Sequence, residues 1–355
     1  MQTRARLDSV DALRGLTVAA MLLVNDAGDW GHVYAPLEHA AWHGCTLADL
    51  IFPFFLFIVG VSLSLSVGPR IDAGGDHVSL RRTVLVRALR IIVLGLVLHA
   101  VAHWLMDTRA FRPFGVLQRI GLCFAVAGLL AIETRPRTQW IAFGAILLGY
   151  WALLSWGGPL SKEGNLASRI DTALLGRLVY EFDAATGLGH EPEGLLSTLP
   201  AIATTLLGVR AGDWLRRGHR SRLWQVGTAA LLAGWVWSCM FPFNKQLWTS
   251  SYVLWSGGWA MLALLAAHEF IDRRGGPALG RSFGVNAIAA YAGAWLMVCV
   301  LEGLHWGGPL YRVAFEWMVP ITGPHVPSLA YAFAFVAVWW VVVAWLDRRK
   351  LYFKI

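Results

Sequence analysis

The sequence predicts an all-α, polytopic integral membrane protein of about ten transmembrane helices, with the N- and C-termini in the cytoplasm. Of its 355 residues, 57% are hydrophobic and only 15% are charged, a balance that excludes an ordinary soluble domain. Apolar runs of roughly 18 or more residues, the length needed to cross the hydrocarbon of a bilayer, recur along the whole chain. The 19 tryptophans suit aromatic belts at the two membrane interfaces.

Ten apolar runs are interpreted as the spans of a single transmembrane domain, residues 1–355. The first run is short and is interrupted by Arg14, and it is included because the charges of the connections support it. We recognise no soluble domain and no internal repeat. The runs lie near residues 12–27, 47–67, 83–103, 114–132, 139–156, 195–214, 223–242, 251–271, 283–303 and 327–346.

The distribution of arginine and lysine predicts the orientation. Every second connection is rich in these residues, and the positive-inside rule places such connections in the cytoplasm. His39, the loop 157–194 and the turn 244–248 then lie on the outer side. Topology therefore accounts for the net charge of +8, which gives no reason to expect nucleic acid. The cytoplasmic set is Arg4, Arg6, Arg70, Arg81, Arg82, Arg135, Arg137, Arg216, Arg217, Arg220, Arg222, Arg273, Arg274, Arg281, Arg348, Arg349 and Lys350, against Arg109, Arg112, Lys245, Arg312 and a few in the long loop.

The four cysteines, Cys45, Cys123, Cys239 and Cys299, lie singly and without metal-ligand spacing. We expect no disulfide and no metal site. The first residues are basic, but no small-residue cleavage site follows the first apolar run. We therefore expect no cleavable signal peptide.

The most informative stretch is 36–60, a histidine-bearing polar turn that runs into an uncharged, phenylalanine-rich helix. Imidazole titrates near neutral pH, so His39 at the mouth of this helix could move protons for a reaction or could be an interfacial hydrogen-bonding residue. Asp49 would cost about 2.5–3.5 kcal/mol if it faced lipid, so we expect it to face the interior and a partner. Asn25 ends the preceding run on the same side, where an amide could hold a carbonyl next to His39.

Near the N-terminus, Asp11 and Arg14 lie three residues apart on one helical face. They could form a self-neutralised pair at a helix start. Alternatively, Arg14 belongs to a cytoplasmic anion site, where Gly15 lets a large anion approach closely.

Other polar residues interrupt the apolar runs. Arg87 and Arg90 lie about two turns into the third run, where they could snorkel or could meet phosphates. Gln118 and Arg119 lie near the outer end of the fourth run, and Arg119 requires a carboxylate, for which Asp49 is the candidate. Asn286 could form hydrogen bonds between helices.

Glu191 and Glu193 flank Pro192 just before the sixth run. Their carboxylates could cap that helix or bind a polar acceptor, and the sequence favours neither alternative.

The chain resembles the heparan-α-glucosaminide N-acetyltransferase family, especially its short bacterial members, the NagX-type glucosamine N-acetyltransferases. The most specific similarities are the His/Trp/Gly/Asp/Phe-Pro block of 39–53 and the Asn-Lys-x-Leu-Trp block of 244–248, whereas Val-Asp-x-x-Arg-Gly at 10–15 is shared with other membrane acyltransferases. The similarity also includes Leu23 to Asn25, Gly115 to Arg119, Pro192 to Pro200 and Asn286.

The resemblance implies an enzyme that moves acetyl from cytoplasmic acetyl-CoA to the amine of a glucosamine on the other side of the membrane. It assigns the active-site histidine to His39, which would be general base or nucleophile, and the matching asparagine to Asn25, with Asp49 beside them. Donor contacts are expected at Arg14, Arg87, Arg90, Gln118, Arg119 and Asn286, and acceptor contacts at Trp42, Glu193, Asn244, Lys245 and Trp248.

By the same resemblance we expect an inner-membrane protein that binds acetyl-CoA and an amino sugar, without a metal, and that could form a homodimer. One departure bears on the acceptor. Many members carry Asp-Pro-Glu-Gly where this chain has Glu191-Pro-Glu-Gly194. Two alternatives remain open, a sugar transporter with a polar path through the membrane and an O-acyltransferase of cell-envelope glycans.

Overall fold

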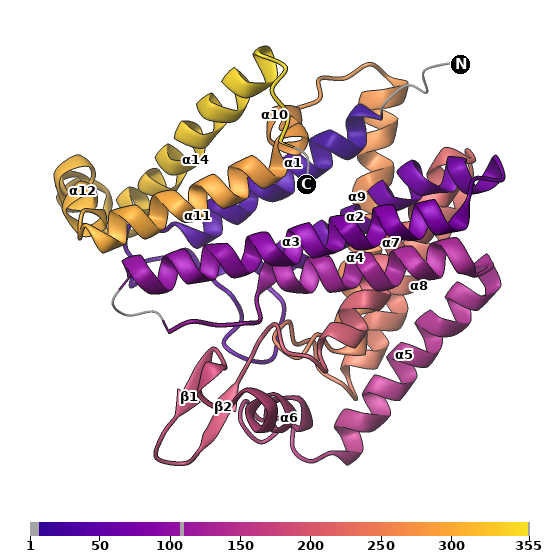
Figure 1. Ribbon diagram of the computed structural model, residues 1–355. Helices are drawn as coiled ribbons and strands as arrows, with labels where there is room; N and C mark the ends of the chain where they lie inside the picture. The colour runs from indigo at the N-terminus through magenta and orange to yellow at the C-terminus, as the bar shows by residue number, and fades with distance from the viewer. Residues whose placement is uncertain (1–6, 107–109, 354–355) are drawn as a thin grey trace.

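The computed structural model describes residues 7–106 and 110–353. Arg4, Arg6 and Arg109, which enter the orientation argument, lie outside the described residues. A helix covers each of the ten apolar runs, and these helices form one bundle (Figure 1). They are α1 (Asp8–Asn25), α2 (Leu47–Asp72), α3 (His77–Leu105), α4 (Val116–Glu133), α5 (Pro136–Trp156), α7 (Thr198–Arg216), α8 (Arg220–Ser238), α9 (Ser250–Ala267), α10 with α11 (Arg281–Val285 and Ala287–Gly303) and α14 (His325–Arg348).

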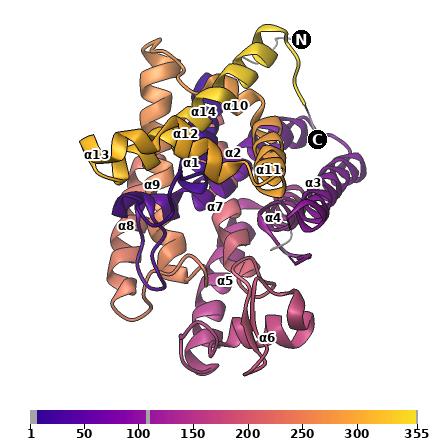
Figure 2. The same cartoon turned by 90° about the vertical axis from the view of Figure 1, so that its left-hand side faces the viewer.

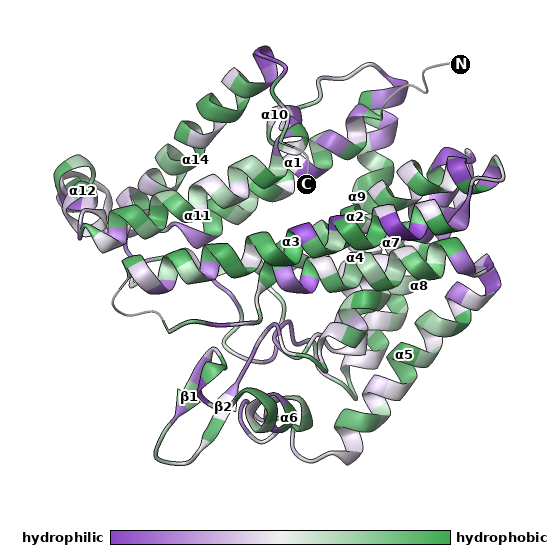
Figure 3. Cartoon of the chain, in the orientation of Figure 1, coloured by the Kyte–Doolittle hydropathy of each residue, from purple (hydrophilic) through white to green (hydrophobic). Residues whose placement is uncertain are grey.

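The all-helical, membrane-spanning class is confirmed, but the number of crossings is not. Among the described residues, six helices are long and apolar enough to span a bilayer: α2, α3, α4, α5, α9 with its extension to Arg273, and α14. A bent pair, α11 with α12 (Gly307–Ala314), would be a seventh. The polar colouring of Figure 3 is concentrated at helix ends and in the connections.

The helix α7 shows how a helix can lie inside the bundle without meeting the apolarity criterion. It is buried at nearly every position, including Arg210 and Asp213, which pair with each other at 2.8 Å. A helix surrounded by protein can carry polar side chains that a lipid-facing helix cannot, provided that they are paired.

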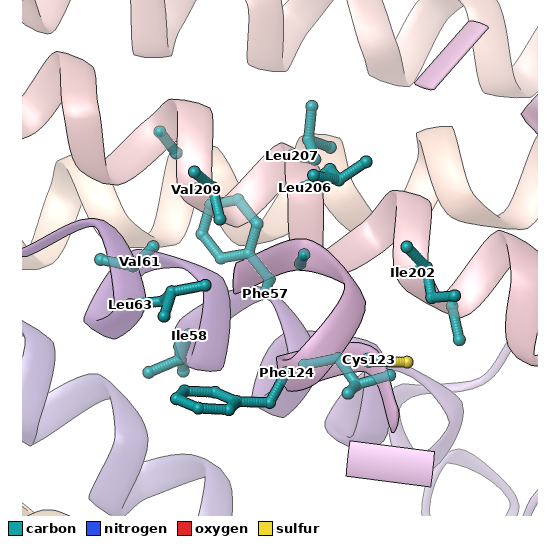
Figure 4. Close-up of a cluster of buried hydrophobic side chains, with 14 of the residues drawn as sticks. Phe57, Ile58, Val61, Leu63, Cys123, Phe124, Ile202, Leu206, Leu207 and Val209 are labelled. Carbon is teal, nitrogen blue, oxygen red and sulfur yellow. The ribbon is translucent and has the colours of Figure 1, made fainter. Parts of the chain in front are cut away.

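The core lies where α2, α4 and α7 meet (Figure 4). The helices α2 and α7 approach so closely that a Cβ on Gly60 would lie 2.0 Å from the carbonyl oxygen of Thr205, and one on Gly208 would lie 2.0 Å from that of Phe57. Small residues allow such backbone contact between membrane helices. The central pair is therefore a rigid base for the residues at its ends.

The long connection 157–194 folds into a small unit at one end of the bundle (Figures 1 and 2). It contains α6 (Leu166–Leu175) and an antiparallel hairpin of β1 (Glu181–Asp183) and β2 (Leu188–His190), in which Glu181 pairs with His190. This hairpin is the departure from an all-helical chain. Its three-residue strands are too short to leave a periodic signal in the sequence.

Short turns complete the chain. After α11 the chain bends by 91° into α12, and the side chains of Trp306, Val313 and Trp317 around it are 60%, 83% and 64% exposed. The remaining short elements are 3-10 turns at Ala35–Leu37, Gly176–Leu178 and Glu316–Met318, a π-helical turn at His268–Arg273, and α13 (Val319–Thr322).

Candidate active site

The candidate site lies at the N-terminal end of α2, where His39 and Asp49 form a pair. Thr46 and Asp49 make a capping box at the start of this helix. The Asp49 carboxylate is 1% exposed; its Oδ2 accepts from the backbone N–H of Thr46 at 3.0 Å and of Ala40 at 3.1 Å, and its Oδ1 lies 2.9 Å from Nδ1 of His39. As expected, Asp49 therefore faces the interior and has a partner.

This contact determines which nitrogen of His39 is free. A carboxylate only accepts hydrogen bonds, so Nδ1 of the neutral imidazole must be the donor and Nε2 carries the lone pair. The imidazole is 43% exposed. An oriented, accessible Nε2 is what a general base or an acyl-accepting nucleophile requires.

A lysine from a distant turn lies against the imidazole. Nζ of Lys245 is 3.1 Å from both Nε2 and Nδ1 of His39, and 3.7 Å from Oδ1 of Asp49. Burial lowers the pKa of Lys245, while the charges of Asp49 and Glu193 oppose that shift. The site thus brings an amine, a base and a carboxylate together.

The turn that presents Lys245 is held by its own neighbours. Asn244 accepts from the backbone of Leu247 at 2.8 Å, and Thr249 donates to the carbonyl of Pro242 at 2.9 Å. Trp248 is fully buried, has a φ of +54° and donates from Nε1 to the hydroxyl of Thr204 at 3.0 Å. A bulky residue persists in the left-handed region only where its surroundings hold it. Asn244 and Trp248 therefore shape the turn.

The histidine-bearing turn is also tied to the 157–194 unit. Trp42 donates from Nε1 to the carbonyl of Leu160 at 2.7 Å and packs edge-on against His190 at 5.3 Å between ring centroids. His190 in turn contacts the hydroxyl of Ser168 at 2.7 Å, and burial lowers its pKa to about 4. Burial also lowers the pKa of the nearby His43. His190 was not among the residues predicted from the sequence, because the end of a three-residue strand has no recognisable sequence pattern.

A second charged cluster, made of Arg112, Arg119, Glu191 and Glu193, lies beside this site. Arg112 pairs with both glutamates, and Nη2 of Arg119 donates to the hydroxyl of Ser197 and, at 3.3 Å, to the carbonyl of Gly194. Burial raises the pKa of Glu191. Burial also opposes ionisation of Glu193, but Arg112 and Arg119 outweigh it and lower the pKa of that carboxyl.

The expectation that Asp49 neutralises Arg119 is wrong. Asp49 is used by His39 and Lys245, and Arg119 instead stacks over Trp248 at 5.2 Å and faces the Glu193 side. Arg112 takes the larger part in binding the glutamates, and the sequence analysis used it only for orientation. The two glutamates that flank Pro192 were the feature of the sequence that could have indicated a cationic partner such as Arg112.

Several buried polar side chains of the described residues have no hydrogen-bond partner. Among the described residues, both polar atoms of Gln118 and of Asn286, and Nε of Arg119, are buried without a hydrogen bond. Gln118 is 3% exposed and Asn286 is fully buried. Unsatisfied amides in a protein interior are costly, and a bound polar ligand is one explanation for them.

The remaining predicted residues lie apart from His39. Asn25 is exposed at the end of α1, and no hydrogen bond among the described residues joins it to His39. Arg87 and Arg90 are on the exposed face of α3, with Arg87 over the ring of Phe124 at 5.3 Å.

The N-terminal arginine is tied into the bundle. Arg14 pairs with Asp11 at 2.9 Å and donates to Ser62 at 2.6 Å, so the pairing alternative is confirmed. The expected room for an anion at Gly15 is absent, because a Cβ there would lie 1.8 Å from the carbonyl of Gly280. Among the described residues, no cluster of three or more His, Cys, Asp or Glu side chains could hold a metal ion.

Comparison with known proteins assigns the family. The family model described as heparan-alpha-glucosaminide N-acetyltransferase, catalytic, matches residues 6–240. The protein of Homo sapiens named heparan-alpha-glucosaminide N-acetyltransferase is 26% identical over 419 aligned residues, and its counterpart from Mus musculus is 27% identical over 420. Both alignments cover 99% of this chain but only 60% of the relative's own length. The chain belongs to the heparan-alpha-glucosaminide N-acetyltransferase family.

Proposed function

We propose that this protein is a transmembrane N-acetyltransferase that moves acetyl from cytoplasmic acetyl-CoA to the amine of a glucosamine-type sugar at the outer face. The observation that carries the proposal is the imidazole of His39, which Asp49 orients through Nδ1 at 2.9 Å and which is 43% exposed. The names of the human and mouse relatives supply the substrate class.

His39 acts as the general base. It takes the proton that the sugar amine loses as the nitrogen attacks the thioester carbonyl, and Asp49 stabilises the resulting imidazolium. Direct transfer requires only this role. An acetyl-histidine intermediate would make the same Nε2 the nucleophile, and a labelled His39 peptide after brief mixing with donor alone would reveal it. Asn25 polarises the carbonyl once donor is bound.

The acceptor binds between the histidine turn and the 157–194 unit. Trp42 and Lys245 form two sides of this region, and Glu193 supplies negative charge that favours an ammonium group. Asn244 and Trp248 act through the turn that they hold.

The donor enters from the opposite side. The unpaired amides of Gln118 and Asn286 suit the amide groups of a pantetheine arm, so the residues present fit acetyl-CoA. Arg119 follows Gln118 in the chain, at the outer end of that path. Arg87 and Arg90 attract the phosphates of the donor at the cytoplasmic end.

The proposal includes ten crossings with both termini in the cytoplasm, an inner-membrane location and a homodimer. Cysteines introduced into the connections, probed with an impermeant thiol reagent, would test the orientation. Labelling of the 244–248 turn from the cytoplasmic side would contradict it.

The decisive experiment measures labelled acetyl transfer from acetyl-CoA to glucosamine in proteoliposomes, for wild type and His39→Ala. We expect N-acetylglucosamine from wild type alone, with both proteins folded. Acetyl ester formation would favour the O-acyltransferase alternative. Sugar movement without transfer would favour the transporter.

A further inference from the structure

The amine of Lys245 occupies the place that an acceptor amine must take. A base accepts a proton from a group within hydrogen-bond distance, about 2.6–3.2 Å between heavy atoms. Nζ of Lys245 lies against the His39 imidazole, 3.1 Å from Nε2 and also 3.1 Å from Nδ1. The substrate-free site therefore already contains a primary amine in contact with its base.

We propose that Lys245 is an internal acetyl acceptor, modified by the site itself when donor is bound and no sugar is present. This inference rests on the proposed function, because it uses the same donor and the same base. It assigns a modification site in the 244–248 turn.

The transfer balances without another reactant. The neutral amine of Lys245 attacks the thioester carbonyl carbon, so a C–N bond forms and the C–S bond breaks, with the electron pair leaving on sulfur. Nζ gives one proton to Nε2 of His39, and the thiolate takes that proton from the imidazolium. The products are acetyl-lysine, CoA thiol and neutral His39.

The surroundings favour the reactive form of this amine over that of an ordinary lysine. Burial lowers the pKa of Lys245, although Asp49 on α2 and Glu193 before α7 work against the shift. Lys162, also in an outer-side connection, is instead ion-paired with Glu181 at 2.5 Å. Lys162 is therefore the matched control for chemical acetylation.

Acetylation of Lys245 would have a direct effect on the site. It removes the positive charge that faces Asp49 at 3.7 Å and puts an amide next to Nε2 of His39. A modified molecule loses the space for an external amine. Bound sugar keeps the amine of Lys245 away from the donor and so protects the enzyme.

The test incubates the purified full-length protein with acetyl-CoA, with and without glucosamine, and measures acetyl occupancy at Lys245 and Lys162 by peptide mass spectrometry. We expect the initial rate of modification at Lys245 to exceed that at Lys162 by about 10²-fold, as base catalysis provides. His39→Ala should lower the rate at Lys245 to that at Lys162, and glucosamine should protect Lys245. In the Lys245→Arg variant the acetylated peptide should be absent, which assigns the modification to Lys245.

Sugar acetylation is measured in the same samples. Unmodified Lys245 in a preparation that acetylates glucosamine would overturn this inference and leave the proposed function standing. Equal modification of Lys245 and Lys162, unchanged by His39→Ala, would also overturn it. If neither the sugar nor Lys245 is acetylated, both proposals fail.

Discussion

Two histidine–aspartate pairs at opposite ends of the bundle differ in what their geometry leaves free. His39 and Asp49 are ten residues apart, and they join a loop to the start of α2 with the imidazole 43% exposed. His268 and Asp272 lie one helical turn apart, at 2.7 Å and 15% and 13% exposed, and Asp272 also accepts from the backbone and hydroxyl of Ser9. The second pair fastens the end of α9 to the start of α1. A histidine–aspartate contact is therefore not sufficient for catalysis, because the other ring nitrogen must also be accessible to substrate.

The largest expected difference is in catalysis. His39→Ala should lower acetyl transfer by about 10²–10⁴-fold, the contribution of a positioned base, whereas His268→Ala should keep most of the activity because its imidazole is used structurally. Initial rates with labelled acetyl-CoA and glucosamine measure both. Equal losses in the two variants would remove the distinction.

A change in the second charged cluster should act on stability. Arg112→Ala leaves Glu191, whose side chain is fully buried, without its partner, and such a change costs about 3–5 kcal/mol in the free energy of unfolding. Arg81→Ala breaks an exposed pair with Glu133 at 3.4 Å and should cost about 1 kcal/mol or less. Denaturant unfolding in detergent compares them, and similar costs would mean that the cluster is not held by this contact.

The orienting carboxylate can be tested without changing volume. Asp49→Asn should reduce the rate of transfer by about 10²-fold, because an amide also donates and no longer selects the tautomer with Nε2 free. Asp272→Asn should leave the rate unchanged. If Asp49→Asn transferred acetyl as fast as wild type, the contact between His39 and Asp49 would not be needed for the reaction.

The smallest effect should be a pH dependence in the 157–194 unit. Burial raises the pKa of Asp171 to about 6, so the folded state holds this proton more tightly than the unfolded state does. The stabilisation is present below about pH 4 and is lost as the pH rises through about 6. Asp171→Asn should flatten that part of the stability profile measured by thermal unfolding. If the pH dependence of stability were the same in Asp171→Asn, other titratable groups would be its cause.

The sequence predicted much of the fold, because each long apolar run needs a helix to satisfy its backbone in a membrane. It also predicted that Asp49 turns inward. It misassigned the partner of Arg119, since contacts between Arg119 and the 194–197 segment depend on helix packing that residue spacing does not encode. The number of crossings is undetermined for the related reason that α7, enclosed by protein, has no need to be apolar.

The site was partly visible in the same way. His39 stood out as a polar residue at a helix mouth, and Lys245 was predicted only from the resemblance of the 244–248 block. The 3.1 Å contact between them joins positions that are far apart in the chain. Asn25 was predicted to face His39 because it ends one apolar run and His39 opens the next on the same side. In the structure Asn25 is exposed and no hydrogen bond of the described residues joins it to His39, so their joint action stays a prediction.

The bend of 91° after α11 connects the enzyme to the thickness of its membrane. Tryptophans prefer the headgroup level, so Trp306 and Trp317 beside α12 would keep this end of the bundle at the lipid surface. Lipids with shorter or longer chains shift that level relative to the rest of the protein. We therefore expect the depth of His39 in the membrane, and with it the rate of the proposed acetyl transfer, to depend on acyl-chain length.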